Sequence, residues 1–201
     1  MTEAIQQYPS KKLMRYRIST PSKNNILNAL KTETHQKSLT NHNLLKHGET
    51  EDRNTMYTTR LSDTVQPEPP KEPRSSFYCE SLLDYPEFAQ LKRQFQKRVR
   101  KYVGEWNLFR GGKSNLKITE SWFNIMREGN SLTFHRHERS IITGAYYPFL
   151  PEGSANLILE GEEIDLEEGY LYLFPSWAEH GTEENKSRER YVISFNVGVV
   201  T

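Results

Sequence analysis

The chain has 201 residues and a mass of 23.6 kDa, which suits one domain with an extension. Its formal net charge of +1 and pI near 7.8 argue against a dedicated nucleic-acid or polyanion binder, because such proteins carry a clear basic excess. No apolar run is long enough for a membrane span, and the N-terminus lacks the apolar core of a secretory signal. The single cysteine, Cys79, predicts no internal disulfide and a reducing, cytoplasmic location.

The composition divides the chain near residue 76. Residues 1–76 hold 12 Lys and Arg against 8 Asp and Glu, a net charge of +4, but only 3 of the 23 aromatic residues. Aromatic side chains dominate core burial, so we expect the core in the C-terminal part. Four prolines within residues 66–74 predict an extended linker. The predicted organisation is therefore a polar extension with a Pro-rich linker over 1–76 and a folded domain over 77–201.

The extension shows only weak patterns. Residues 13–18 predict a short strand, and residues 21–30 predict a short helix with a proline near its start and apolar residues on one face. We expect the rest to be partly disordered or ordered only where it wraps against the core. The spacing of His35, His42 and His47 matches no compact metal motif, so these histidines are interpreted as solvated.

A helix is predicted after the linker, with Asp84 as its cap and Pro86 in its first turn. Its apolar residues recur at helical spacing opposite a basic face, as in a helix that covers a sheet: Leu91, Phe95, Val99, Tyr102 and Val103. Short strands are expected at 117–127, 132–135, 140–149, 155–160, 170–175 and 190–199, and the acidic run 160–168 is expected to be a solvated loop. Many short strands with no helix between them predict a mainly β barrel or jelly roll.

Three histidines follow the linker and are candidates for a metal site. His135 and His137 are two residues apart, so on a strand both point to the same side. His180 follows a later strand, and a rolled sheet would bring it beside this pair. Imidazole suits Fe, Zn, Cu and Ni, and three protein ligands leave positions open for catalysis. The alternative is that they are three unrelated histidines held by hydrogen bonds.

Arg190 is the candidate anion-binding residue. Strand alternation places it on one face with Val192, Ser194 and Asn196, while Ile193 and Phe195 take the other. A basic residue on the inner face of a strand is costly unless it meets an anion, and the guanidinium group fits a carboxylate with two parallel hydrogen bonds. A salt bridge at the rim with a nearby glutamate is the alternative. Arg188 is the rival candidate, but it precedes the apolar run.

These motifs occur in an order that resembles a small bacterial and phage family of iron(II)/2-oxoglutarate-dependent oxygenases. The resemblance covers about residue 77 to the C-terminus and rests on Ser121-Trp122-Phe123-Asn124, Gly129, His135-x-His137, Thr143-Gly144-Ala145-Tyr146-Tyr147, Gly169, Phe174-Pro175-Ser176-Trp177-x-x-His180 and Glu189-Arg190-x-x-x-Ser194-Phe195-Asn196. It implies a double-stranded β-helix, also called a jelly roll and related to cupins, with a supporting helix. It also implies ferrous iron as the cofactor, with 2-oxoglutarate and O₂ as cosubstrates.

The resemblance also assigns roles to residues. His135, His137 and His180 would bind iron, and Arg190 would hold the distal carboxylate of 2-oxoglutarate. Thr143 and Tyr147 would line the same carboxylate. Asn124 and Asn196 would lie near the iron-bound end of the cosubstrate or the substrate. Ser194 takes the place of a serine that many relatives carry two residues after the arginine, where this chain has Val192. No catalytic side chain beyond these is expected.

One position departs from the wider superfamily. An Asp or Glu usually stands two residues after the first histidine, where this chain has His137, and Glu138 would point to the other face. The site is interpreted either as a three-histidine iron centre, which leaves the full metal charge to attract an anionic cosubstrate, or as a two-histidine centre with His137 behind it and water as the third ligand.

The predicted function is hydroxylation of a C–H bond in a small molecule or a peptide side chain. One alternative is a three-histidine cupin-type dioxygenase that uses no 2-oxoglutarate, with Arg190 binding a substrate carboxylate. Another is a non-catalytic jelly-roll binding module. The expected partners are the substrate and O₂, without nucleic acid or membrane, and a homodimer is left open.

Overall fold

The computed structural model describes residues 12–32, 81–106, 115–137 and 140–200, together with the backbone of three short strands at 6–8, 40–41 and 57–58. The described strands form two antiparallel sheets. The larger one has eight strands in the order β1 (Gln6–Tyr8), β2 (Leu13–Arg17), β10 (Tyr170–Pro175), β7 (Ile142–Phe149), β12 (Glu189–Val199), β5 (Leu116–Arg127), β4 (Tyr57–Thr58) and β3 (Thr40–Asn41).

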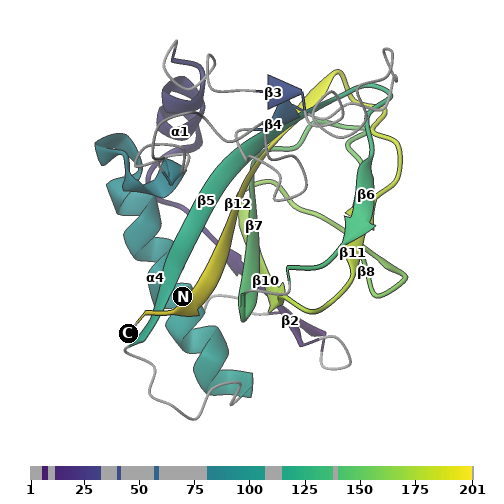
Figure 1. The fold of residues 1–201 in the computed structure, drawn as a ribbon. Helices are drawn as coiled ribbons and strands as arrows, with labels where there is room; N and C mark the ends of the chain where they lie inside the picture. Colours follow the sequence, from purple (N-terminus) through teal and green to yellow (C-terminus); the bar gives the residue numbers. More distant parts are fainter. Residues whose placement is uncertain are drawn as a thin grey trace, which may run out of the picture.

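The smaller sheet faces the large one across a shared interior. Its four strands run in the order β6 (Leu132–His135), β11 (His180–Thr182), β8 (Leu157–Leu159) and β9 (Glu162–Ile164). Helices α1 (Lys23–Leu30) and α4 (Ala89–Trp106) lie on the opposite side of the large sheet (Figure 1). The result is the predicted mainly β jelly roll with a supporting helix. Among the described residues, no helix combines the length and the apolar character needed to cross a membrane.

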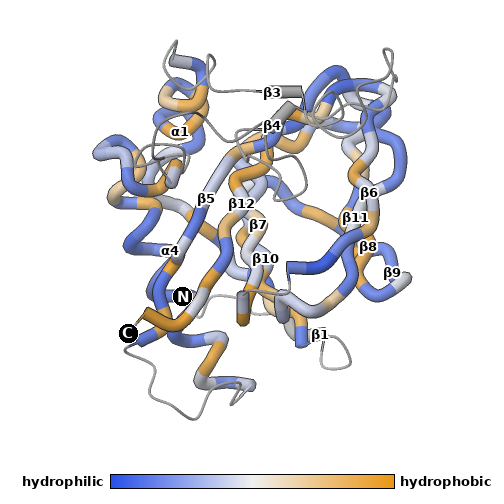
Figure 2. The backbone as a smooth tube through the Cα atoms, viewed as in Figure 1, coloured by the Kyte–Doolittle hydropathy of each residue, from blue (hydrophilic) through white to orange (hydrophobic). Residues whose placement is uncertain are grey.

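The large sheet has two different faces because its strands alternate. On the face toward α4, β12 contributes an unbroken apolar set that packs with the buried residues of the helix: Tyr191, Ile193, Phe195 and Val197. The other face of β12 carries Arg190, Val192, Ser194 and Asn196, all buried. Hydrophobic stretches follow β10 and β12, whereas the turn at β9 is hydrophilic (Figure 2). The larger apolar core lies on the helix side, and the interior between the sheets holds a smaller apolar cluster, which includes Tyr147, Phe174 and Val192, together with the polar groups.

A bulge in β5 decides which of its residues face this interior. β12 pairs with β5 along its whole length, but the register shifts between Asn196 and Val197, which pair with Glu120 and Ile118. Thr119 is the extra residue, and it reverses the alternation of the strand. Ile118 therefore joins the core on the helix side, while Glu120 and Trp122 fall on the interior face with Asn124.

The predicted elements are confirmed with small shifts at their ends. The strands at 132–135 and 170–175 have the expected bounds, and the apolar face of the predicted helix is fully buried in α4. Asp84 was wrongly predicted as the helix cap. It ends the turn η2 (Leu82–Asp84), is bonded by Lys92, and is followed by a second turn, η3 (Pro86–Phe88), before α4 begins. Pro86 explains the delay, since proline fits a turn or the first residues of a helix.

The acidic segment 160–168 is not a simple solvated loop as predicted. It contains β9, whose first two residues are exposed glutamates and whose last residue, Ile164, is almost fully buried. β11 was not predicted at all, because a three-residue strand is too short to show a period.

The N-terminal extension contributes to the sheet. β2 pairs with β10, and Ile26 and Leu30 of α1 belong to the helix-side core. This part therefore wraps against the core, as one of the two expectations had it. The predicted linker, Cys79, and the histidines at 35, 42 and 47 lie outside the described residues, and the division at residue 76 stays a prediction.

Gly144 is required by the packing of the helix-side core. A Cβ atom at this position would lie 2.2 Å from the ring of Phe195, which stacks on Phe95 of α4. We expect Gly144→Ala to lower the free energy of unfolding by about 1–3 kcal/mol, the usual cost of overpacking a core, in chemical denaturation. Gly198→Ala is the matched control, because its Cβ meets only the exposed side chain of Thr119 at 3.2 Å. Equal stability of the two variants would contradict the close approach.

Candidate metal centre and anion site

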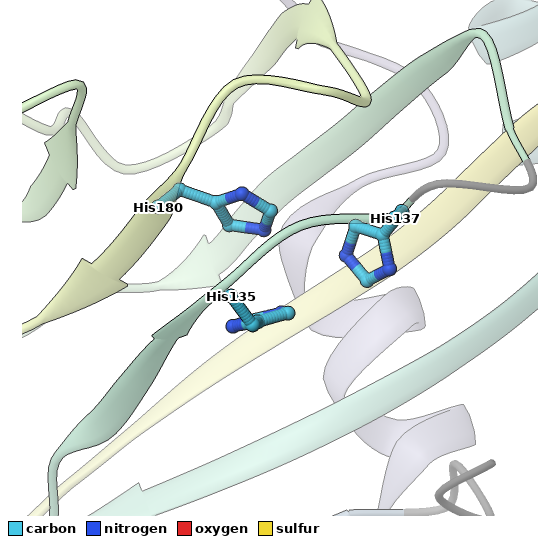
Figure 3. Close-up of side chains that lie close together, drawn as sticks. All are labelled: His135, His137 and His180. Carbon is cyan, nitrogen blue, oxygen red and sulfur yellow. The ribbon is translucent and has the colours of Figure 1, made fainter.

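The three predicted metal ligands come together. One ring nitrogen from each of His135, His137 and His180 lies within 4.8 Å of the others. The reason is the strand register: His180 opens β11 and pairs directly with His135 at the end of β6. His137 follows two residues later, beyond the strand. Figure 3 shows the three rings converging on one point, with the His135 and His180 centroids 4.4 Å apart.

Hydrogen bonds to the backbone orient two of the rings. Nδ1 of His135 lies 2.8 Å from the carbonyl oxygen of Thr133, and Nδ1 of His180 lies 2.9 Å from that of Ala178. A carbonyl only accepts, so Nδ1 donates in both cases and Nε2 keeps its lone pair for a metal. His137 is placed through its backbone, whose N–H donates to the carbonyl of Ser176 at 2.9 Å.

Aromatic rings pack against two of the three histidines. His137 and His180 are buried, and His135 is half-buried. Trp122 packs 5.9 Å from the His137 ring, and Phe174 packs 4.9 Å from the His180 ring. Three neutral imidazoles suit Fe(II) and other borderline transition metals, and they leave the charge of a bound ion uncompensated. Glu138 lies outside the described residues.

Arg190 lies on the interior face, as predicted, and is only 2% exposed. One terminal nitrogen donates to the carbonyl of Ala155 at 2.5 Å, and the guanidinium lies 5.6 Å from the ring centre of Tyr147. Its Nε has no hydrogen-bond partner, and no carboxylate of the described residues pairs with it. The alternative of a rim salt bridge is therefore wrong for the part of the chain that the structure describes. Arg188, the rival candidate, is exposed.

Burial shifts the pKa values of Arg190 and of its neighbour Tyr147. It lowers the pKa of the Arg190 guanidinium, with a smaller opposing effect of Tyr147. It also raises the pKa of Tyr147 to about 12, although Arg190 pulls that value down. An arginine keeps its charge even so, and the tyrosine keeps its proton at neutral pH, so both remain hydrogen-bond donors.

Asn124 lies beside this pair. It is on the interior face of β5, opposite Val192, and two residue pairs along the ladder from Arg190, which is the next pair on this face. Its side-chain oxygen is buried without a hydrogen-bond partner. Unsatisfied buried polar atoms are rare in native proteins and need a reason. Together, Nε of Arg190 and Oδ1 of Asn124 are two such atoms on neighbouring strands, which fits a polar ligand between the sheets.

Thr143 and Asn196 are not brought to Arg190. Oγ1 of Thr143 lies 3.0 Å from Oδ1 of Asn196 and 3.0 Å from Oγ of Ser176. Tyr147 is four residues further along β7, about 13 Å away at the usual rise of a strand. Ser194 lies between the two groups on β12, opposite Trp122 and Ala145. The predicted cosubstrate residues therefore form two clusters, at the two ends of the interior.

Two residues near the histidines were missed in the sequence. Glu120 lies on the interior face and accepts a hydrogen bond from Asn196. Counting back in twos from Asn124 would have found it. Ser176, fully buried, contacts both His137 and Thr143, but it stands in a turn after β10 and no periodic signal marks it.

Comparisons with known proteins show the fold. No protein-family model and no curated protein match the sequence. Among solved structures, the non-heme alpha-ketoglutarate-dependent epimerase SnoN from nogalamycin biosynthesis matches with a TM-score of 0.66 and 9% identity, covering 97% of this chain and 81% of that one. A Pseudomonas putida prolyl-4-hydroxylase matches with a TM-score of 0.59 and 15% identity, covering 96% and 95%. A 2-oxoglutarate-Fe(II) oxygenase family protein from Burkholderia pseudomallei has a TM-score of 0.48 at 11% identity, and the chain spans 59% of its length.

The first two of these likenesses confirm the jelly-roll fold that the motifs implied. At 9 and 15% identity they establish the fold of such oxygenases and no more. The roles of the individual side chains rest on the geometry of this chain.

A buried arginine without a counter-charge should reduce stability. We expect Arg190→Met to raise the free energy of unfolding by about 1 kcal/mol or more relative to the native protein, because an apolar side chain of similar length avoids burying a charge. Urea denaturation measures this, with the exposed Arg188→Met as the control that should change nothing. A clear loss of stability in Arg190→Met would instead make its bond to Ala155 a structural requirement.

Proposed function

We propose that the chain is an Fe(II)- and 2-oxoglutarate-dependent dioxygenase that hydroxylates a C–H bond of a small molecule or a peptide side chain. The observation that carries this proposal is the pairing of two features inside one jelly roll. Three histidines converge with their ring nitrogens within 4.8 Å, and Arg190, which has no acidic partner in the part of the chain that the structure describes, is buried on the facing sheet. The fold shared with SnoN and the prolyl-4-hydroxylase supports it.

The residues present fit both groups. Nε2 of His135 and of His180 is left for a metal by the carbonyl bonds at Nδ1. The Nε–H of Arg190 needs a hydrogen-bond acceptor, and the side-chain oxygen of Asn124 needs a donor. A bound ligand can supply the acceptor, and either the ligand or a bridging water can supply the donor. A carboxylate satisfies the arginine best, because its two oxygens match the guanidinium geometry.

Each part of the chain then has a role. Bound Fe(II), with 2-oxoglutarate and O₂, supplies an oxidant strong enough for an unactivated C–H bond. The histidines would hold the metal in one orientation through their backbone bonds. Arg190 would bind the distal carboxylate of 2-oxoglutarate, with the protonated hydroxyl of Tyr147 as a second donor. Trp122 and Phe174 would limit water around the histidines. The cytoplasmic location, the absence of a nucleic-acid partner and a homodimer stay predictions.

Anaerobic titration tests the proposal. The protein with Fe(II) should develop a visible charge-transfer band when 2-oxoglutarate is added, and it should release succinate in air. Arg190→Met should bind Fe(II) normally but lose the 2-oxoglutarate band, because the distal carboxylate loses the guanidinium group proposed to bind it. Arg188→Met, at an exposed position, should behave as the native protein.

Other outcomes distinguish the alternatives. Fe(II) binding with no response to 2-oxoglutarate would favour a three-histidine dioxygenase of the cupin type. If the titration detects no tight Fe(II) binding, the result would favour a non-catalytic binding module and would contradict the proposal.

His137→Asp and His137→Leu together test the third ligand. If His137 coordinates the metal, the aspartate variant should keep measurable Fe(II) affinity, since a carboxylate is an equivalent ligand, while the leucine variant should lose at least tenfold. Isothermal titration with Fe(II) under anaerobic conditions gives both affinities. Equal affinities for the native protein and His137→Leu would place His137 behind the metal centre.

A further inference from the structure

Four polar side chains form a hydrogen-bonded chain at the His137 end of the interior. They come from four separate segments: Ser176 from the turn after β10, Thr143 from β7, Asn196 from β12 and Glu120 from β5. Ser176 and Asn196 are fully buried, and Thr143 is 3% exposed. Glu120 is half-buried, so this row of hydrogen-bonded side chains extends from the buried interior toward the surface.

The hydrogen bonds between these four side chains all run in one direction, from Ser176 toward Glu120. The amide oxygen of Asn196 only accepts, so Thr143 donates to it, and the hydroxyl of Ser176 must then donate to Thr143. The amide nitrogen of Asn196 donates to the carboxylate of Glu120. A carboxylate at the end fixes the orientation of the amide and therefore of every hydroxyl before it.

Ser176 connects this chain to a metal ligand. His137 lies beyond the end of β6 and has no ladder partner in that strand. Its backbone is held instead by the carbonyl of Ser176, at 2.9 Å, and the amide of Ser176 donates in turn to Ile141 at 3.1 Å. Of the three histidines, His135 and His180 are fixed by the pairing of β6 with β11. The backbone of His137 has two hydrogen bonds, one to the carbonyl of Ser176 and one from the amide of Ser140 at 3.1 Å, and the bond to Ser176 links it to the polar side chains.

We propose that Thr143 and Asn196 are positioning residues for the metal ligand His137, acting through Ser176, with Glu120 as the anionic anchor of the chain. This inference rests on the proposed function, since it needs the histidines to bind a metal. It differs from the roles that the resemblance implies, in which Thr143 lines the distal carboxylate and Asn196 lies near the iron-bound end of the cosubstrate or the substrate, and those roles stay predictions. Both donor and acceptor groups of the Asn196 amide are used within the chain, and Thr143 lies about 13 Å along its strand from Tyr147.

Binding of Co(II) alone tests the proposal, because it needs no turnover and the visible spectrum of Co(II) reports ligand geometry. Thr143→Val removes the hydroxyl at nearly constant volume and should weaken Co(II) binding 10- to 100-fold, as the loss of a supporting partner does. It should also change the d–d bands. Thr143→Ser, which keeps the hydroxyl, should restore affinity to within a few-fold of the native value. At saturating Co(II), the affinity of Thr143→Val for 2-oxoglutarate should be unchanged.

Ser187→Ala is the matched control. Its hydroxyl is also buried and bonded, to Asn185, but it has no link to His137. It should bind Co(II) as the native protein does. If Thr143→Val is poorly folded by circular dichroism, Glu120→Ala at the half-buried end of the chain carries the same expectation.

Three results would overturn the inference: native Co(II) affinity and spectrum in Thr143→Val, an equal loss in Ser187→Ala, or a loss of 2-oxoglutarate affinity with metal binding intact. His135→Ala separates this failure from that of the proposed function. If His135→Ala loses Co(II) while Thr143→Val keeps it, only the positioning role fails. If His135→Ala binds Co(II) like the native protein, the metal centre itself is wrong and both fail.

Discussion

A guanidinium group that is buried between two sheets and has no counter-charge among the described residues is the constraint on which the rest of the structure depends. Its cost is large, and the bond from Arg190 to Ala155 offsets only part of it. A fold can keep such a group only where other packing supplies the stability. Here the apolar residues of β12, β7 and β10 pack against α4 on the other face of the same strands. This helix-side core is the larger of the two apolar clusters, and the interior combines the smaller one with the polar groups of the proposed site.

The interior is organised by strand register. β12 places Arg190 and Asn196 on one face but six residues apart, so the strand separates an anion-binding end from an end that supports His137. The histidines come from the facing sheet, where the pairing of β6 with β11 sets two of them opposite each other. Each sheet thus contributes one half of the proposed site, and neither half is complete alone.

Much of this could be predicted from the sequence, because period-two alternation determines which face a side chain takes. The place of Arg190 on the inner face followed from that rule, whereas His137 lies beyond the end of β6 and reaches the other two histidines from outside the strand. The rule does not say which end of a face a residue occupies, so the grouping of Thr143 and Tyr147 around one carboxylate, which the resemblance implied, stays a prediction. Ser176 stands in a turn, and β11 has three residues, so neither leaves a periodic signal. Residue type helped where position failed: three histidines and an arginine are informative because they are costly to bury.

The direct pairing of His135 with His180 has a consequence for the folding of the small sheet. About forty-five residues of chain separate these two partners, and they include β7, β8, β9 and β10. An ion held by both rings closes this long loop, as a disulfide would, and removes much of the entropy that the loop has in the unfolded chain. The metal would then hold β6 and β11 together across this long-range pairing, so that metal binding and the final closure of the jelly roll would be one event.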